Sequence, residues 1–329
     1  MDLRSLRYFV AVVEAGSLTR AAGTLYIAQP ALTAQIKKLE SALETQLFER
    51  THAGVIPTAA GLELYQDARR LLSDAAALKD RISRQPHELA GSVTIAAPFL
   101  LTSLLAGRLI ARVRQSHPRI RLFFIDDLSL MVVKAMVDRR ADIGILVDTQ
   151  HVEGLDCTPL AQECIYFCGY DASRAVTPDL KAAPSKARGD RPDIEFRHAA
   201  KLPLVMQSKR FTIRRTVEEA AHAKGITLNI EHEHDSARVI RSLYLSGAGF
   251  TFTPACALSE SPTQGKGWFA ARVVNPLLTR SYSLALPARA ASRPAVDAVC
   301  TALQDEIESL IHSGKWIAQR LYQPPRHSR

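Results

Sequence analysis

The sequence predicts an α/β protein in which a small helical domain and one long helix precede a larger domain of alternating strands and helices. Three observations lead to this fold class. Two short amphipathic helical patterns lie close together near the N-terminus, a heptad of apolar residues follows them, and short apolar runs alternate with helical patterns from residue 92 onward. Alternation of this last kind is typical of mostly parallel sheets covered by helices.

The length of 329 residues is more than one core usually organises, and it indicates two or three domains. Changes of pattern divide the chain into an N-terminal domain at 1–58, a long helix at 59–88, an α/β domain at 89–312 and a basic tail at 313–329. No run approaches ~20 apolar residues, and the first residues lead into an amphipathic helix rather than a signal peptide. We therefore expect a cytoplasmic protein that does not enter a membrane.

The net charge of +9 and the pI of about 9.5 favour a polyanionic partner or an anionic ligand. Residues 1–58 hold only one positive charge in excess of their acidic residues. Affinity of this domain for DNA would therefore depend on where its cations lie and on binding in several copies. Its basic residues are Arg4, Arg7, Arg20, Lys37, Lys38 and Arg50.

The cysteines and histidines do not form a pattern that is typical of a disulfide framework, a metal site or a catalytic site. The five cysteines are spaced irregularly, which favours buried structural thiols, with a redox sensor as the alternative. His232 and His234 alternate with acidic residues on an expected strand, but a third metal ligand is not evident, so a polar strand edge is the simpler interpretation. No nucleophile elbow or phosphate loop appears. We therefore expect no cofactor, no metal and no enzyme activity.

The N-terminal domain begins with a helix predicted over Leu3 to Ala15, and two shorter helices follow. Ser17 is a candidate N-cap for a helix at about 18–25. Gln29-Pro30 predicts the start of the next helix, about 30–43, because proline at the first helical position loses only an N–H that had no partner.

The helix at about 30–43 has one apolar and one polar face. Leu32, Ile36, Leu39 and Leu43 form the apolar stripe. The opposite face carries Pro30, Thr33, Ala34, Lys37 and Lys38. Such a face fits a DNA major groove, which favours a helix-turn-helix; an ordinary amphipathic pair packed on a globular core is the alternative.

A small hairpin and a long helix are predicted next. Residues 47–58 read as two short strands around a turn, a wing in which Arg50 either reaches a phosphate or is simply solvated. Thr58 caps a helix of ~25 residues whose apolar positions form a heptad seam. An antiparallel copy of the same helix is the favoured partner for this seam, and packing on its own domain is the alternative. The seam positions are Leu64, Ala68, Leu71, Ala75, Leu78 and Ile82.

Residues 1–58 resemble the winged helix-turn-helix of LysR-type transcriptional regulators, and the resemblance continues more weakly to about residue 310. The matching motifs are Leu6-Arg7-Tyr8-Phe9, Gly16-Ser17, Ala21-Ala22, Ala28-Gln29-Pro30-Ala31-Leu32, Gln35-Ile36, Leu39-Glu40, Leu47-Phe48-Glu49-Arg50 and Ala60-Gly61. The resemblance implies a dimerising linker helix, a periplasmic-binding-protein-like (type 2) effector domain with two lobes, and a homotetramer. The candidate DNA-contacting residues are Ser17, Thr19, Gln29, Pro30, Ala31, Thr33, Gln35, Lys37, Lys38 and Arg50.

The α/β domain is expected to form two lobes around a cleft, lobe I at about 92–168 and 270–312 and lobe II at about 171–265. Residues 171–200 are rich in proline and basic residues and read as a surface loop, and the tail from Lys315 reads as poorly ordered. The expected strands are 92–97, 120–125, 142–147, 164–168, 202–206, 226–230, 250–253, 272–274 and 282–286, and the expected helices are 101–115, 130–139, 212–224, 236–246 and 294–312.

Ligands of open α/β sheets bind beyond the strand ends, at helix N-termini that present free N–H groups. Three such corners, 98–103, 207–212 and 234–236, face the expected cleft. Hydroxyl groups there, with Lys209 or Arg210 as charge partner, favour a small carboxylate, although the hydroxyls would also serve as plain helix caps. With the positions that the resemblance implies, the candidate effector-binding residues are Pro98, Phe99, Leu100, Leu101, Thr102, Ser208, Arg210, Phe211, Thr212 and Thr253.

These observations predict a DNA-binding transcriptional regulator of LysR type. Its expected partners are double-stranded DNA, a small and anionic effector, and further copies of itself. The alternative is a small-molecule receptor whose N-terminal helices serve only oligomerisation. The two differ in whether the protein binds DNA in a salt-dependent way.

Overall fold

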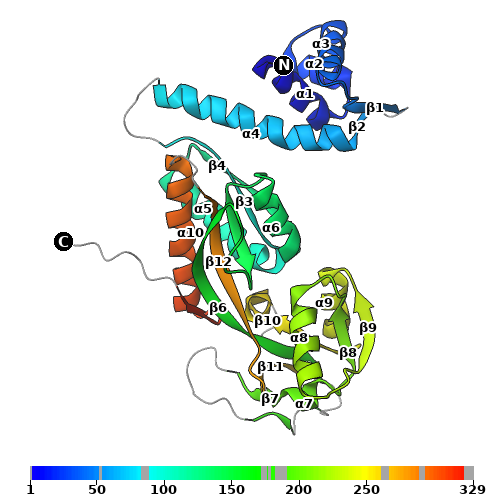
Figure 1. Cartoon of the computed structure of the whole chain (residues 1–329), viewed down its shortest axis with the longest axis vertical. Coiled ribbons are helices and arrows are strands. Elements are labelled where there is room, and N and C mark those ends of the chain that lie inside the picture. Colours follow the sequence, from blue (N-terminus) through cyan, green and yellow to red (C-terminus); the bar gives the residue numbers. More distant parts are fainter. Residues whose placement is uncertain are drawn as a thin grey trace, which may run out of the picture. The chain divides into compact units, whose positions relative to one another are not determined.

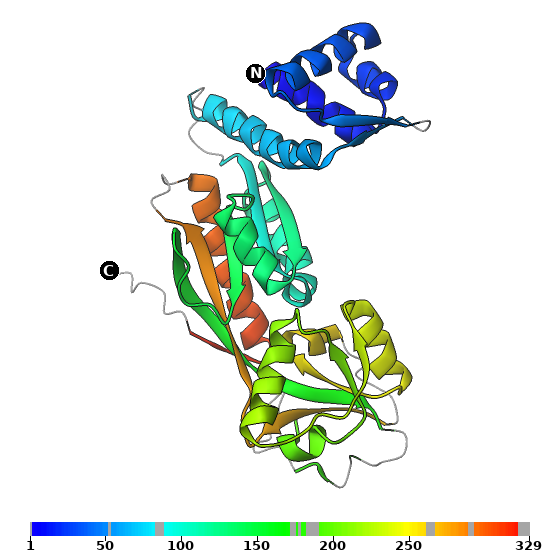
Figure 2. The same ribbon diagram turned by 45° about the vertical axis from the view of Figure 1, so that its right-hand side comes forward.

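The structure, a computed structural model, describes residues 2–51, 54–82, 89–171, 176, 179–181, 191–260, 267–288 and 293–321. The chain divides into two compact units. One comprises residues 1–92 with 117–121, and the other comprises residues 93–116 with 122–329. Figure 1 and Figure 2 show the elements of each unit.

The first unit is a helical domain with a two-stranded wing. Its elements are α1 (Leu3–Ala15), α2 (Leu18–Leu25), α3 (Gln29–Ala42), β1 (Phe48–Thr51), β2 (Gly54–Pro57) and α4 (Ala59–Ile82). The side chain of Asp2 accepts a hydrogen bond from Ser5 N and so begins α1, and Gly16 ends it in the left-handed conformation. Ser17 Oγ accepts from Arg20 N, which makes it the N-cap of α2 as predicted.

The predicted apolar stripe of α3 lies in the core of this unit. Leu32, Ile36 and Leu39 are buried, and they pack with Leu6 and Phe9 of α1. Leu43 is only partly buried because it is the C-cap residue of α3. The opposite face of α3 is therefore left to the surface.

The wing is tied to the helices at both ends. Val55 N donates to Gly16 O at 3.2 Å, and a Cβ on Gly54 would lie 2.4 Å from that same oxygen, so only glycine fits there. At the other end Thr58 Oγ1 accepts from Gly61 N at 3.0 Å, the cap predicted for the long helix. The turn at residues 52–53 and the side chain of Arg50 lie outside the described residues.

Helix α4 uses part of the predicted heptad seam within its own unit. Ala68 is fully buried against the core of the helical domain, and Leu64 is partly buried there. Leu71 is 42% exposed. The first two seam positions therefore pack on the domain itself, as in the alternative interpretation of the seam, whereas Leu71 lies at the surface. The side chains of Leu78 and Ile82 lie outside the described residues.

The second unit has two lobes that share strands. Lobe I contains β3 (Gly91–Pro98), α5 (Phe99–Ser116), β4 (Ile120–Asp127), α6 (Ser129–Val137), β5 (Ile143–Val147), η2 (Ala255–Glu260), β12 (Thr279–Pro287), α10 (Pro294–His312) and β13 (Ala318–Arg320). Lobe II contains β7 (Asp193–Glu195), α7 (Phe196–Ala199), β8 (Leu204–Gln207), α8 (Thr212–Ala223), β9 (Ile230–His234), α9 (Ala237–Ser246), β10 (Phe250–Pro254) and β11 (Trp268–Val274).

Strand β6 (Leu155–Tyr170) runs through both lobes (Figure 1). Residues 155–164 pair with β12 in lobe I, and residues 165–170 pair with β10 and β11 in lobe II. The sheet order is β4-β3-β5-β12-β6-β10-β8-β9. In lobe I the helices α5 and α10 pack together on one side and α6 packs against β5 and β12 (Figure 2).

Several predicted elements of the α/β domain differ from the structure. The strand expected at 226–230 is instead β9 at Ile230–His234, because an edge strand tolerates the polar run of glutamates and histidines. The loop expected to extend to residue 200 ends in β7 and α7, where Ile194 and Phe196 are fully buried. The tail from Lys315, expected to be poorly ordered, begins with packed residues, since Trp316 is buried and β13 pairs with β6. Residues 322–329 and most of 172–190 lie outside the described residues.

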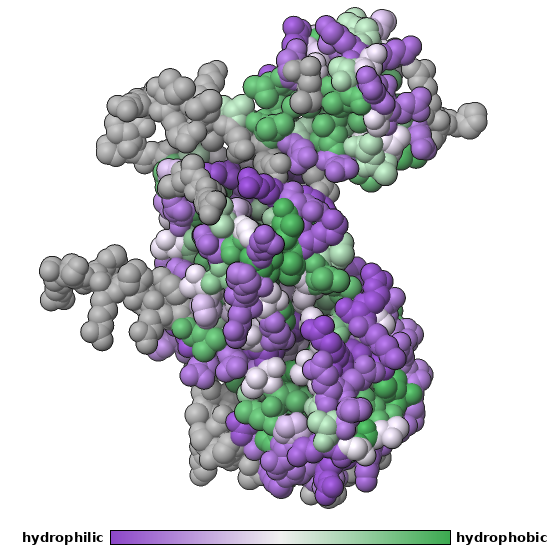
Figure 3. Space-filling view, in the orientation of Figure 1, coloured by the Kyte–Doolittle hydropathy of each residue, from purple (hydrophilic) through white to green (hydrophobic). Residues whose placement is uncertain are grey.

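The surface view shows that the outer side of lobe II over α8 and β9 is mainly hydrophilic, whereas α6 presents apolar side chains (Figure 3). Leu130 and Val137 of α6 are 73% and 53% exposed. Among the described residues, no helix is long and apolar enough to cross a lipid bilayer.

Candidate functional site

Nine of the ten candidate DNA-contacting residues lie on α2, on α3 or at the N-cap of α2, and Arg50 lies on β1. Thr19, Gln29, Pro30, Ala31, Gln35, Lys37 and Lys38 are exposed, and Ser17 and Thr33 are partly buried. Thr33 Oγ1 donates to Gln29 O at 3.0 Å, and Gln29 Nε2 donates to Thr33 Oγ1 at 3.3 Å. These hydrogen bonds hold the side chains of Gln29 and Thr33 against each other on α3. The side chain of Arg50, the remaining candidate, is outside the described part of the chain.

A groove of about 630 Å³ lies between α3 and the wing, and Thr33 and Lys37 form part of its wall. Glu40 on α3 accepts hydrogen bonds from Leu47 N at 2.9 Å and Phe48 N at 3.3 Å. This carboxylate holds the start of the wing against α3. These hydrogen bonds within the domain help to fix the position of the wing relative to α3.

A second cavity lies between the lobes of the α/β domain, with a volume of about 80 Å³. Two of the three expected corners contribute to it. Of the candidate effector-binding residues, Pro98, Phe99, Leu100, Leu101, Phe211, Thr212 and Thr253 line this cavity. Phe99 of lobe I and Phe211 of lobe II both line the cavity and meet edge to face, with ring centroids 6.2 Å apart.

Three candidates do not line the cavity, because local partners hold them elsewhere. Thr102 Oγ1 donates to Pro98 O at 3.2 Å, one helical turn back. Ser208 Oγ donates to Asp235 Oδ1, and Arg210 Nη1 lies 3.7 Å from Asp235 Oδ2. The third expected corner, which contains Asp235, therefore supplies the partners of Ser208 and Arg210 outside the pocket.

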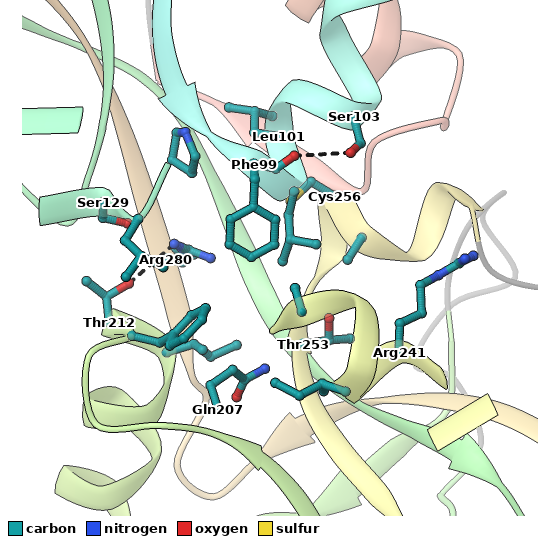
Figure 4. Close-up of a pocket in the computed structure, with 18 of the residues that line it drawn as sticks. Phe99, Leu101, Ser103, Ser129, Gln207, Thr212, Arg241, Thr253, Cys256 and Arg280 are labelled. Atoms are coloured by element: carbon teal, nitrogen blue, oxygen red, sulfur yellow. Dashed lines mark hydrogen bonds between the residues drawn. The ribbon is translucent and has the colours of Figure 1, made fainter. Parts of the chain in front are cut away.

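One charged side chain that lines the pocket is that of Arg280 on β12, which the sequence reasoning missed (Figure 4). Its side chain is 7% exposed, Nη2 donates to Thr212 Oγ1 at 3.3 Å, and Nε has no hydrogen-bond partner among the described residues. Burial lowers the pKa of its guanidinium, but the neighbouring Tyr282, Cys256 and Glu163 outweigh that effect and raise it. Arg280 therefore remains a buried cation.

The local sequence pattern did not indicate Arg280. Ser283 and Ala285 are buried along with Arg280, Tyr282 and Leu284, so this strand does not alternate between one buried and one exposed face. The predicted strand began at Tyr282, two residues too late to include the arginine.

Behind the pocket wall, Glu163 of β6 connects four segments of the chain. It is fully buried and accepts hydrogen bonds from Cys256 N at 2.7 Å, from Trp316 Nε1 at 2.6 Å and from the hydroxyl of Tyr282. Burial raises the pKa of the Glu163 carboxyl, and Arg280 and these donors offset part of that effect. The guanidinium of Arg280 lies over the Tyr282 ring at 5.6 Å, so this cluster supports the cation from behind.

Comparison with known proteins agrees with this two-part arrangement. Residues 3–62 match the model described as bacterial regulatory helix-turn-helix protein, lysR family, and residues 86–308 match the model described as LysR substrate binding domain. The chain belongs to the LysR family. It is a DNA-binding transcriptional regulator with an effector-binding domain.

Relatives of this LysR-type regulator cover three quarters of the chain or more. The nitrogen assimilation regulatory protein nac of Escherichia coli K12 is 30% identical over 310 residues, which are 94% of this chain and 96% of that protein. The DNA-binding transcriptional dual regulator OxyR of the same strain is 26% identical over 262 residues, covering 78% of this chain and 80% of OxyR.

Solved structures show the same fold. A full-length OxyR point variant from Pseudomonas aeruginosa has a TM-score of 0.65 and 23% identity, covering 98% of this chain and 99% of that one. CbnR in complex with its target DNA has a TM-score of 0.65 and 20% identity, covering 93% and 100%. At these identities the likeness concerns the fold alone.

The histidine and cysteine candidates of this regulator are not assembled into a site. His232 and His234 stack with ring centroids 6.5 Å apart, and Glu233 between them accepts from Arg214 Nη1 at 2.9 Å. Among the described residues no three metal-ligating side chains come together. The five cysteines are free thiols, and burial raises the pKa of Cys300 to about 12 and that of Cys168 still further. Thiols with such raised pKa values are poor nucleophiles at neutral pH.

Proposed function

We propose that this LysR-type regulator binds duplex DNA as a homo-oligomer, a homotetramer in full assembly, and that a small anion in the inter-lobe pocket modulates its binding. The observation that carries the second part is the buried Arg280, whose Nε has no hydrogen-bond partner among the described residues. A buried guanidinium is stabilised when an anion supplies the missing acceptors.

In the DNA-bound state we assign α3 to the major groove. Gln29, Pro30 and Thr33 face the bases, and Gln35, Lys37 and Arg50 lie mainly against phosphates. Ala31 and Lys38 lie beside them, and Ser17 and Thr19 approach the backbone at the start of α2, where the free N–H groups favour a phosphate. The exposure of Thr19, Gln29, Pro30, Ala31, Gln35, Lys37 and Lys38 supports this assignment. CbnR, a structural neighbour, has been solved with its target DNA.

The pairing of two copies is assigned to the part of α4 that begins near Leu71. Leu71 is exposed, and burying it against an apolar partner helix would stabilise the pair. Two paired copies would then hold their two α3 helices at a fixed spacing, which suits a symmetric operator. Replacing Leu71 with Asp should reduce the assembly to smaller species in sedimentation velocity. Unchanged assembly of that variant would contradict this pairing.

We assign to the effector a shift of the equilibrium between open and closed arrangements of the two lobes. Pocket residues come from both lobes, including Phe99 and Leu101 of lobe I and Phe211 and Thr212 of lobe II. A ligand that contacts both lobes binds a closed arrangement more tightly than an open one and so increases its population. Closure would change the angle between paired DNA-binding domains and thereby the bend of the DNA.

The test is a gel-shift titration of the full-length protein on the DNA upstream of its own gene, at several salt concentrations. Specific binding that weakens steeply with salt is the expected result. The alternative, a small-molecule receptor whose N-terminal helices only oligomerise, requires no such affinity. A protein that assembles and binds small anions but ignores its own upstream DNA would replace the proposal with that alternative.

A further inference from the structure

Buried polar groups gather in the inter-lobe pocket. Ten polar or charged side chains are buried in the described part of the chain, and four of them line this pocket, namely Gln207, Thr251, Thr253 and Arg280. Three buried side-chain nitrogen or oxygen atoms of the described residues have no hydrogen-bond partner, and two of these belong to pocket residues: Arg280 Nε and Gln207 Oε1. The first is a donor and the second an acceptor, so a ligand that satisfies both must carry an acceptor and a donor.

The polar wall opposite the core of lobe II is built by two neighbouring strands, β8 and β10, which pair in parallel. Alternate residues of both strands lie in the core of lobe II, as Met206 and Phe252 do. Because side chains alternate along a strand, Gln207, Thr251 and Thr253 fall on the other face, and all three line the pocket. Figure 4 draws Gln207 and Thr253 as parts of this wall.

The orientation of the Gln207 amide follows from its neighbours. Its backbone oxygen accepts from Arg214 Nη1 at 2.9 Å, which holds the end of β8 in place. Its Nε2 donates to Phe252 O at 3.5 Å. Turning the amide over would set two carbonyl oxygens against each other, so Oε1 is the atom left without a donor. A buried acceptor without a donor is destabilising, and a ligand that supplies the donor gains from removing that cost.

The charges of the pocket favour a hydroxyl over an ammonium group as this donor. Among the described residues that line it, the charged side chains are Asp127, Arg241 and Arg280. Asp127 Oδ1 already accepts from Leu128 N at 2.7 Å. An ammonium would add a third cation and would need acceptors for three N–H groups, whereas a hydroxyl is neutral and needs one acceptor.

We infer that the pocket selects a hydroxylated organic acid, with the acid group on Arg280 and a hydroxyl that donates to Gln207 Oε1. The inference rests on the proposed function, because the acid group is the anion assigned there. It adds the hydroxyl as a second requirement and Gln207 as the residue that recognises it. An acid without a donor leaves the buried oxygen unsatisfied and is rejected for that reason.

The test is titration calorimetry of the full-length protein with carboxylates that are matched except for hydroxyl groups. Propionate is paired with lactate and with 3-hydroxypropionate, butyrate with 4-hydroxybutyrate, and hexanoate with gluconate, so that the hydroxyl stands at increasing separations from the carboxylate. At least one hydroxy acid should bind about tenfold or more tightly than its partner, because it alone supplies a donor to the buried oxygen of Gln207. Equal affinities within every pair would overturn the inference.

Variants of two glutamines separate recognition of the hydroxyl from general effects. Gln207→Met keeps the length of the side chain and removes the acceptor, so the affinities within the preferred pair should come to within about twofold of each other. Gln115→Met, at an exposed position of α5 outside the pocket, is the matched control and should keep the full preference. Arg280→Met should weaken both members of the pair by a similar factor, since both place their acid group there. A preference that persists in Gln207→Met would assign the hydroxyl to another partner and contradict the inference.

A second variant covers the case in which Gln207→Met does not fold. Gln207→Glu keeps an acceptor and adds a negative charge. It should weaken binding of every acid but retain the preference for the hydroxy acid, and it should improve binding of β-alanine relative to 3-hydroxypropionate. Loss of the hydroxyl preference in Gln207→Glu would count against the assigned contact.

The two proposals fail in different ways. If none of the acids binds, both the hydroxylated class and the anionic effector of the proposed function are wrong. If the members of each pair bind equally and lose affinity in Arg280→Met, the anionic effector stands and the hydroxyl assignment is wrong. If β-alanine binds the unmodified protein more tightly than 3-hydroxypropionate, the donor is an ammonium group and the hydroxyl assignment is again wrong.

Discussion

Trp316 Nε1 donates to Glu163 Oε2 at 2.6 Å, which joins the segment after the last long helix to the strand shared by both lobes. The indole ring also packs edge to face on Tyr282, with centroids 5.4 Å apart. Tyr282 lines the pocket on its other side. The C-terminal segment is therefore part of the support behind the ligand pocket, which the expectation of a loose tail missed.

Replacing Trp316 with Phe should lower the free energy of unfolding by about 1.5–3 kcal/mol, because the buried Glu163 carboxyl loses a donor while the aromatic contact with Tyr282 is kept. Urea unfolding followed by far-UV circular dichroism measures the change. Trp268→Phe is the matched control, since the Trp268 indole makes no hydrogen bond among the described residues. Equal losses in the two variants would show that the ring alone matters.

The buried Glu163 should give the protein a pH-dependent stability. Burial raises the pKa of this carboxyl above its ordinary value of 4.5. The native state then holds the proton more tightly than the unfolded chain, so the free energy of unfolding should fall as the pH rises from about 4.5 through the raised native pKa. In Glu163→Gln this fall should disappear.

The measurement is a series of urea unfolding curves between pH 4.5 and 8. Glu153→Gln, at an exposed position, is the matched control and should keep the slope of the native protein. A slope that persists in Glu163→Gln would assign the pH dependence to other groups.

Two glycines of the DNA-binding domain should respond in opposite directions to alanine. A Cβ on Gly61 would lie 2.2 Å from the carbonyl oxygen of Leu47, so Gly61→Ala forces α4 away from the wing and should destabilise this domain by about 1–3 kcal/mol. Gly23, on the exposed side of α2, has nothing within 4 Å of such a Cβ, and Gly23→Ala should stabilise by about 0.5–1 kcal/mol.

Hydrogen–deuterium exchange of peptides from residues 1–60 reports the stability of this domain separately from the rest of the chain. Faster exchange is expected in Gly61→Ala and slower exchange in Gly23→Ala. Similar exchange in both variants would mean that the close contact at Leu47 relaxes without cost.

Lys37 should contribute to DNA affinity through phosphate charge. Lys37→Ala should reduce the slope of log affinity against log salt by about one, because one fewer counterion is released on binding. Gel shifts or fluorescence anisotropy across a salt series measure this slope. Lys201→Ala, an exposed lysine of lobe II, is the control, and an unchanged slope in Lys37→Ala would show that this lysine does not touch the DNA backbone.

The sequence was most informative where periodicity and caps act locally. The stripe of Leu32, Ile36 and Leu39 and the caps at Ser17 and Thr58 follow from residues within one or two helical turns, and the structure agrees with them. Two of the corners predicted where a strand ends and a helix begins, 98–103 and 207–212, also contribute residues to the pocket.

The charge partner in the pocket could not be predicted in the same way. The sequence reasoning favoured Arg210, next to the candidate hydroxyl groups, but Arg210 is exposed and pairs with Asp235. Arg280 reaches Thr212 from a strand 68 residues further along the chain. Such a contact depends on how β12 is placed by its pairing with β6, which is information that local spacing does not contain.

The continuity of β6 determines how the two lobes can move. A single strand of 16 residues belongs to both lobes, so they are joined by hydrogen-bonded backbone on both sides of residue 164. A large change in the angle between the lobes would have to break hydrogen bonds of this strand, so the closure proposed above should be small. A bound molecule is thus expected to act through a slight rotation of one lobe against the other.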